Sequence, residues 1–138
     1  MIIKRDFYLN KLISARQNNM VKVITGIRRC GKSFLLFNLF KEYLSQNGID
    51  ESHFIEIQFD DFAFRKYRNA EEAYNFVKSK LIDSKQYYIF LDEVQLLENF
   101  EDVLNGFLHI PNADVYVTGS NAKFLSKDII TEFRGRGD

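Results

Sequence analysis

The segment from Gly26 to Ser33 constrains the fold more than any other part of this sequence. It reads Gly-Ile-Arg-Arg-Cys-Gly-Lys-Ser and fits the pattern G-x-x-x-x-G-K-[ST]. The β-rich run Val21-Lys22-Val23-Ile24-Thr25 precedes it, and an apolar helical pattern begins at Lys32. A loop that joins a strand to a helix in this way is typical of an α/β fold. A glycine-bearing turn would match the pattern by chance, but it would not need these flanks.

This loop predicts a phosphate site. Gly26 and Gly31 let the backbone curl so that successive N–H groups point into one concavity at the start of a helix. We expect Lys32 to bridge the β- and γ-phosphates of ATP, and the Ser33 hydroxyl to ligate Mg²⁺. The residues expected to surround the nucleotide are Gly26, Ile27, Arg28, Arg29, Cys30, Gly31, Lys32, Ser33 and Phe34.

A second apolar run, Tyr87 to Leu91, ends in Asp92 and Glu93. Open α/β sheets bind ligands at the carboxyl ends of their strands, so the Asp92 carboxylate is expected to help hold the magnesium ion. Glu93 beside it is the expected catalytic carboxylate that polarises the attacking water. The alternative is that the two carboxylates only cap the next helix.

The run Val115 to Thr118 predicts a further strand, followed by Gly119, Ser120 and Asn121. A hydroxyl or amide at this strand end can sense the γ-phosphate. Thr118 and Ser120 are stronger candidates for this sensor than Asn121. The alternative for Ser120 and Asn121 is a helix N-cap, for which both residue types suit.

Arg134 and Arg136 lie in the closing Phe-Arg-Gly-Arg-Gly stretch. An arginine that follows the last helix can act as a finger on the γ-phosphate, in its own or a neighbouring subunit. A surface turn is an equal alternative for these two residues.

The whole chain alternates between short apolar runs and longer amphipathic ones, which predicts a three-layer α/β fold with a mainly parallel sheet. We expect Asn69 to cap the helix that begins at Ala70. The expected strands are 21–25, 54–59, 87–91 and 115–118, and the expected helices are 6–16, 32–44, 70–81, 97–108 and 122–133.

Composition narrows the possible partners and compartment. The 138 residues suffice for one domain, and 19 Lys and Arg balance 19 Asp and Glu, so no overall field favours nucleic acid or an anionic membrane. A local basic patch that binds nucleic acid remains an open alternative. No apolar run approaches the roughly 18–20 residues that span a bilayer. With Cys30 as the single cysteine, we expect a cytoplasmic protein.

These motifs together resemble the AAA+ P-loop ATPases. More narrowly, the chain is similar to a bacterial and archaeal AAA-type ATPase family whose members carry a C-terminal, nuclease-like domain. The resemblance rests on residues 25–33, on Leu91-Asp92-Glu93-Val94-Gln95, on Val117-Thr118-Gly119-Ser120 and on the pair Gly135-Arg136.

The resemblance implies an ATP site made of Lys32, Ser33, Asp92 and Glu93, with Ser120 and Arg136 as weaker candidates for catalysis. It also implies a sheet with the strand order 5-1-4-3-2. We expect strand five and the C-terminal effector domain to be missing, so that the chain is the N-terminal part of a longer protein.

The expected function is an ATPase that drives or gates a C-terminal or partner domain. A second copy of the chain, in a homo-oligomer, is a further candidate partner. A nucleotide switch without hydrolysis and a helicase-like, DNA-associated motor remain the alternatives.

Overall fold

The computed structural model describes residues 10, 13–14, 16, 21–25, 34–119 and 130–134. Within these residues the chain is a three-layer α/β domain, as the sequence predicts. Its elements are β1 (Val21–Thr25), the π-helix η1 (Phe34–Phe40), α3 (Lys41–Gln46), the 3₁₀ helix η2 (Glu51–His53), β2 (Phe54–Gln58), the 3₁₀ helix η3 (Phe62–Arg68), α4 (Ala70–Lys80), β3 (Tyr87–Asp92), the 3₁₀ helix η4 (Val94–Leu96), α5 (Phe100–Leu108), β4 (Ala113–Thr118) and β5 (Ile130–Arg134).

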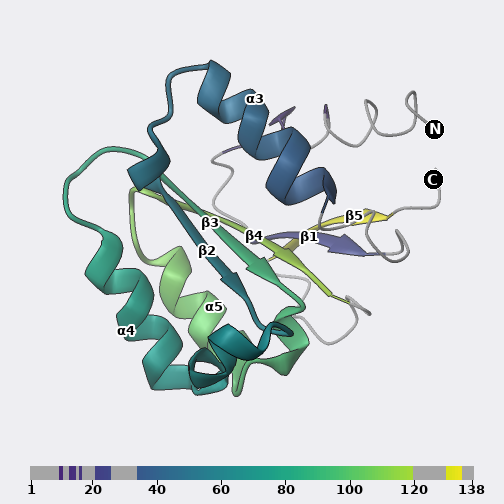
Figure 1. The fold of residues 1–138 in the computed structure, drawn as a ribbon, viewed down its shortest axis with the longest axis vertical. Helices are drawn as coiled ribbons and strands as arrows, with labels where there is room; N and C mark the ends of the chain where they lie inside the picture. The colour runs from purple at the N-terminus through teal and green to yellow at the C-terminus, as the bar shows by residue number, and fades with distance from the viewer. Residues whose placement is uncertain are drawn as a thin grey trace.

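The strands form one sheet in the order β2-β3-β4-β1-β5, and every neighbouring pair is parallel (Figure 1). Read from the other side, this is the expected order 5-1-4-3-2. Parallel neighbours need crossover connections, and the described helices lie in the connections from β1 to β2, from β2 to β3 and from β3 to β4. All five strands therefore end at the same edge of the sheet.

The fifth strand corrects one expectation. The apolar spacing of residues 122–133 predicted a helix and a sheet without its last strand, but Ile130–Arg134 is a strand that pairs with β1. The sequence Ile129-Ile130-Thr131 places three β-branched residues in a row, and such residues lose side-chain freedom in a helix. Their β propensity decides the structure here, so the truncation before strand five is wrong. Residues 122–129 lie outside the described residues.

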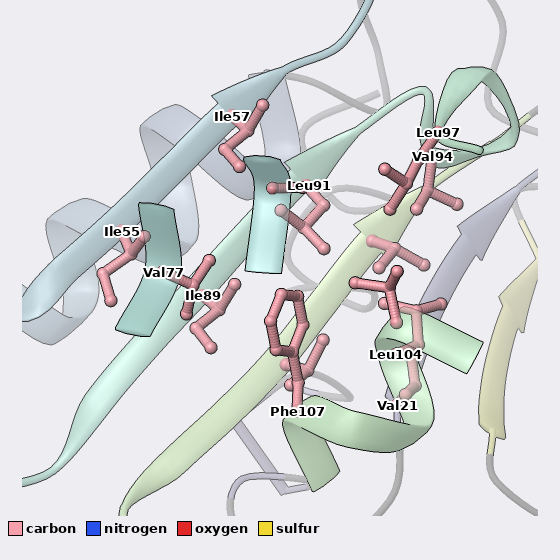
Figure 2. Close-up of a cluster of buried hydrophobic side chains, with 14 of the residues drawn as sticks. Val21, Ile55, Ile57, Val77, Ile89, Leu91, Val94, Leu97, Leu104 and Phe107 are labelled. Carbon is pink, nitrogen blue, oxygen red and sulfur yellow. The ribbon is translucent and has the colours of Figure 1, made fainter. Parts of the chain in front are cut away.

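Helices cover both faces of the sheet. The segment formed by η1 and α3 lies over one face, and α4 and α5 lie over the other (Figure 1). Figure 2 shows the larger core cluster, which fills the layer between the sheet and α4 and α5. Its labelled members are Val21, Ile55, Ile57, Val77, Ile89, Leu91, Val94, Leu97, Leu104 and Phe107. On the other face, Phe40 and Leu44 pack against Tyr88, Phe90 and Tyr116.

Local signals fix the helix ends. The Asn69 side chain accepts a hydrogen bond from the Glu72 N–H at 3.0 Å, which confirms it as the cap of α4. Gly48, two residues after α3, has φ of 96°, a conformation that suits glycine.

The helix expected over 32–44 is a helix from Phe34 onward, but it begins as a π-helix. Of the leading helix expected over 6–16, the structure describes residues 10, 13–14 and 16, and the first three are helical.

A buried ion pair joins β1 to β4 on the face that α3 covers. Lys22 is fully buried and pairs with Asp114, whose other carboxylate oxygen accepts the Tyr116 hydroxyl at 2.7 Å. The Lys22 ammonium also lies 4.9 Å from the centre of the Tyr116 ring. Burial lowers the pKa of Lys22, and the neighbouring Asp114 carboxylate acts in the opposite direction.

Replacement of Asp114 by Ala is expected to lower the free energy of unfolding by about 3–5 kcal/mol, because the Lys22 ammonium would stay buried without this carboxylate. Urea denaturation followed by circular dichroism measures the loss. Asp60→Ala, at an exposed position, is the matched control and is expected to change stability by less than about 0.5 kcal/mol. Equal stability of the two variants would contradict the assignment. Joint replacement by Lys22→Met and Asp114→Leu should recover part of the loss.

Candidate functional site

The carboxyl end of β3 carries the two acidic residues that the sequence singles out. Asp92 is the last residue of β3 and only 6% of it is exposed. Its backbone carbonyl accepts a hydrogen bond from the N–H of Phe59, just beyond β2. Because β3 lies between β2 and β4, Asp92 has a neighbouring strand on each side.

One hydroxyl connects Asp92 and Glu93 to the neighbouring strand. The Thr118 hydroxyl at the end of β4 donates to Asp92 Oδ1 at 2.5 Å and accepts the Glu93 N–H at 2.9 Å. Thr118 is fully buried. Both hydrogen bonds therefore form away from bulk water, where a polar group without a partner is costly.

Glu93 leaves the sheet in an unusual backbone conformation. Its φ of 56° and ψ of 55° lie in the left-handed region, which a non-glycine residue occupies at a cost of about 1–3 kcal/mol. Its carboxylate Oε1 accepts a hydrogen bond from Nε2 of Gln95 at 2.8 Å. Glu93 is thus held at its backbone by Thr118 and at its carboxylate by Gln95.

Capping does not explain these carboxylates. Glu93 precedes the short η4 but makes no side-chain cap bond to it. The next α-helix, α5, begins only at Phe100, with Asn99 at its N-cap position. The Asp92 carboxylate, for its part, is bonded to the hydroxyl of Thr118.

The strand that leads into the glycine-rich loop ends beside this constellation. Ile24 of β1 is paired with Thr118 of β4, and its carbonyl accepts the Gly119 N–H at 3.3 Å. Gly26 follows the last residue of β1, so the loop begins at the edge where Asp92 and Thr118 lie. On the far side of β1, the backbone of Arg134 in β5 is paired with Thr25.

Several predicted site residues lie outside the described residues, and their placement stays a prediction. They are Gly26, Ile27, Arg28, Arg29, Cys30, Gly31, Lys32, Ser33, Ser120, Asn121 and Arg136. The backbone of Phe34 is described and forms the first residue of the π-helix. The structure thus describes Thr25 and Phe34, which flank the predicted phosphate loop, together with Asp92 and Glu93.

The contacts of Thr118 bear on the expected γ-phosphate sensor. A hydroxyl has one proton, and Thr118 donates that proton to Asp92. In this arrangement it has none to donate to a phosphate, which leaves Ser120 and Asn121 as the candidates for a sensor.

Gln95 is the residue that the sequence reasoning missed as a contact. Gln95 entered the prediction only as the last residue of the motif Asp-Glu-x-Gln, in which it follows Glu93 by two positions. That spacing across a short helical turn is the signal that could have pointed to the pair. The other amide atom of Gln95, Oε1, is buried without a hydrogen-bond partner among the described residues.

The donor set fits magnesium. Mg²⁺ takes oxygen ligands, keeps several waters and is usually bound through one or two carboxylates plus substrate phosphates. Asp92 offers such a carboxylate at the sheet edge where β1, on the far side of β4, also ends and leads toward Ser33. Across the described part of the chain, no group of three or more His, Cys, Asp or Glu side chains could hold a metal ion by itself.

A cavity of about 360 Å³ opens next to Gln95, but its chemistry does not suit a nucleotide. It is lined by Gln95, Leu97, Asn99, Phe100, Glu101 and Asp102. The carboxylates of Glu101 and Asp102 would repel phosphate groups. Of the helices that the structure describes, none has the length and apolar character needed to cross a membrane.

Comparison with known proteins agrees with this geometry. Residues 18–138 match the model of a family described as AAA domain. An uncharacterised protein of Haemophilus influenzae is 33% identical over 136 residues, which cover 98% of this chain and 34% of that protein. An uncharacterised protein of Methanocaldococcus jannaschii is 32% identical over 135 residues, with 98% and 28% covered. The chain thus spans about a third of the length of the curated relatives it matches.

Two solved structures share the fold. A chain from the structure of Drosophila ORC bound to DNA superposes with a TM-score of 0.62 at 12% identity, over 94% of this chain and 88% of that one. A chain from Drosophila ORC bound to AT-rich DNA and Cdc6 gives a TM-score of 0.57 at 9% identity, over 95% and 53%. From the family match, the parallel sheet and the position of Asp92 and Glu93, we conclude that the chain belongs to the AAA domain family of nucleotide-binding ATPases.

Proposed function

We propose that this chain binds ATP with magnesium and hydrolyses it, and that turnover drives or gates a C-terminal or partner domain. The observation that carries the proposal is the pair Asp92 and Glu93, tied by Thr118 at the sheet edge where β1 leads into the glycine-rich loop. A loop for phosphates alone would be compatible with binding only. A second, buried carboxylate beside an oriented glutamate adds what hydrolysis requires.

The residues divide the chemistry between them. The backbone of the loop and Lys32 would bind the β- and γ-phosphates, while Ser33 and Asp92 would hold the magnesium ion. When bound, magnesium neutralises charge on the phosphate oxygens. Burial of Asp92 lowers the local dielectric, which strengthens its attraction for a cation.

Glu93 suits the role of general base. A base must be oriented toward the water that it activates, and Glu93 is held both at its N–H and at its carboxylate. The proton of the water would pass to this carboxylate as the water oxygen attacks the γ-phosphorus. The bond between the γ-phosphorus and the β,γ-bridging oxygen would break, and ADP would leave. Ser120 as a sensor and Arg136 as an arginine finger, in this chain or in a second copy, complete the proposed catalytic set.

The other readings have weaker support from the described residues. A switch without turnover would leave the orientation of Glu93 without a use. A DNA-associated motor has only a fold likeness to the ORC chains behind it, and the charges of this chain balance. DNA-stimulated turnover of the longer protein would favour that motor.

Replacement of Lys32 by Ala is expected to weaken ATP binding by at least about 100-fold, because the ammonium that pairs with the β- and γ-phosphates is lost. Isothermal titration calorimetry with Mg-ATP measures the affinity. Lys80→Ala, at an exposed position of α4, is the control and should bind as the unmodified chain does. Retained affinity of the Lys32 variant would remove the phosphate site from the proposal.

Replacement of Glu93 by Gln should retain ATP binding and lower kcat by about 10²–10⁴-fold, because the amide cannot accept the proton of the attacking water. Phosphate release by this chain and by the longer protein measures the rate. Glu71→Gln, exposed in the first turn of α4, is the control. Equal turnover of the Glu93 variant and the unmodified protein would favour the nucleotide switch instead.

A further inference from the structure

Thr118 contacts both members of the acidic pair, Asp92 and Glu93, although it belongs to a different strand. We propose that Thr118 is a positioning residue that fixes Asp92 and Glu93 relative to each other, so that the metal carboxylate and the base are held as one unit. This inference rests on the proposed hydrolysis of ATP. It assigns Thr118 a role other than contact with the γ-phosphate.

The chemistry of a hydroxyl accounts for the choice of residue. A hydroxyl carries one proton and two lone pairs, so it can donate to a carboxylate and accept an N–H at once. Thr118 does both, toward Asp92 Oδ1 at 2.5 Å and from the Glu93 N–H at 2.9 Å. Because Thr118 is fully buried, bulk water cannot take over these bonds if the hydroxyl is removed. Serine retains the hydroxyl, and valine retains the shape without it.

Glu93 needs this support because its backbone is strained. The left-handed conformation at φ of 56° persists only where the surroundings hold it. The bond from its N–H to Thr118 is one such restraint, and the bond from Gln95 to its carboxylate is another. Loss of the first would let the backbone relax toward more favourable angles and turn the carboxylate away from its present direction.

The same residue links the acidic pair to the strand before the phosphate loop. Thr118 is paired with Ile24 of β1, and the next residue, Gly119, donates its N–H to the Ile24 carbonyl. Ile24 precedes Gly26 by two residues. The distance between the proposed base and the phosphates is therefore set through β4, with Thr118 as the contact between β3 and β1.

The test compares Thr118→Val with Thr118→Ser in the 138-residue chain and in the longer protein. For the valine variant we expect kcat for ATP hydrolysis to fall by about 10- to 100-fold, as misplacement of a catalytic group by about 1 Å does. The affinity for Mg-ATP should change by less than about threefold, since Lys32 and the loop are untouched. The serine variant should recover kcat to within about threefold of the unmodified protein.

Hydrogen exchange of the Glu93 amide gives a readout that does not depend on nucleotide. The Glu93 N–H should be protected in the unmodified chain and in Thr118→Ser, and should exchange at least about 10-fold faster in Thr118→Val, where its acceptor is gone. The amide of Ile89, inside β3, should stay protected in all three and reports that the sheet is intact. If the valine variant does not fold, Thr118→Ala takes its place. Ser79→Ala, which removes an exposed hydroxyl from α4, is the control.

The outcomes separate this inference from the proposed function. Unchanged kcat and unchanged Glu93 exchange in Thr118→Val, with Glu93→Gln inactive, would overturn the positioning role and leave hydrolysis standing. An equal loss of kcat in the serine and valine variants would also overturn it. If the unmodified protein does not hydrolyse ATP, the proposed function fails, and faster Glu93 exchange in the valine variant would still establish the structural tie.

Discussion

The parallel pairing of β1, β3 and β4 is the constraint on which the rest of the structure depends. Parallel strands have no tight hairpins between them, so the chain must cross over the sheet after each strand, and helices then cover both faces. That coverage buries β3 along its whole length. It also brings the carboxyl ends of all the strands to one edge, where polar groups that follow the strands can meet a ligand.

Much of this fold can be predicted from the sequence because parallel strands and amphipathic helices differ in their periodicity. The run Tyr87 to Leu91 is apolar without alternation, as a strand covered on both faces should be, and Asn69 caps α4 as its residue type suggests. Where spacing and propensity disagreed, at residues 130–134, spacing gave the wrong answer. An edge strand gains its stability from pairing with β1, and that partner is far away in the sequence.

In the candidate site, too, the sequence predicts some residues and not others. Asp92 and Glu93 could be found because their position after a buried strand is a property of the local sequence. The role of the Thr118 hydroxyl could not be assigned, since a phosphate sensor, a helix cap and a link between a carboxylate and a backbone N–H all use the same residue type at a strand end. The choice depends on which atoms of β3 lie opposite β4, and therefore on register. The contact from Gln95 likewise depends on the left-handed turn at Glu93, which is unusual for a glutamate.

Two polar groups of β4 illustrate how the same strand serves stability at one end and chemistry at the other. Asp114, near its start, is matched by a buried cation on β1. At its end, Thr118 brings a neutral hydroxyl to the Asp92 carboxylate, which adds no charge of its own. A lysine at Thr118 would neutralise Asp92 permanently and compete with magnesium. A valine would leave the carboxylate buried without this donor. A hydroxyl holds the carboxylate in place without cancelling its charge, which is the property that the proposed magnesium site would require.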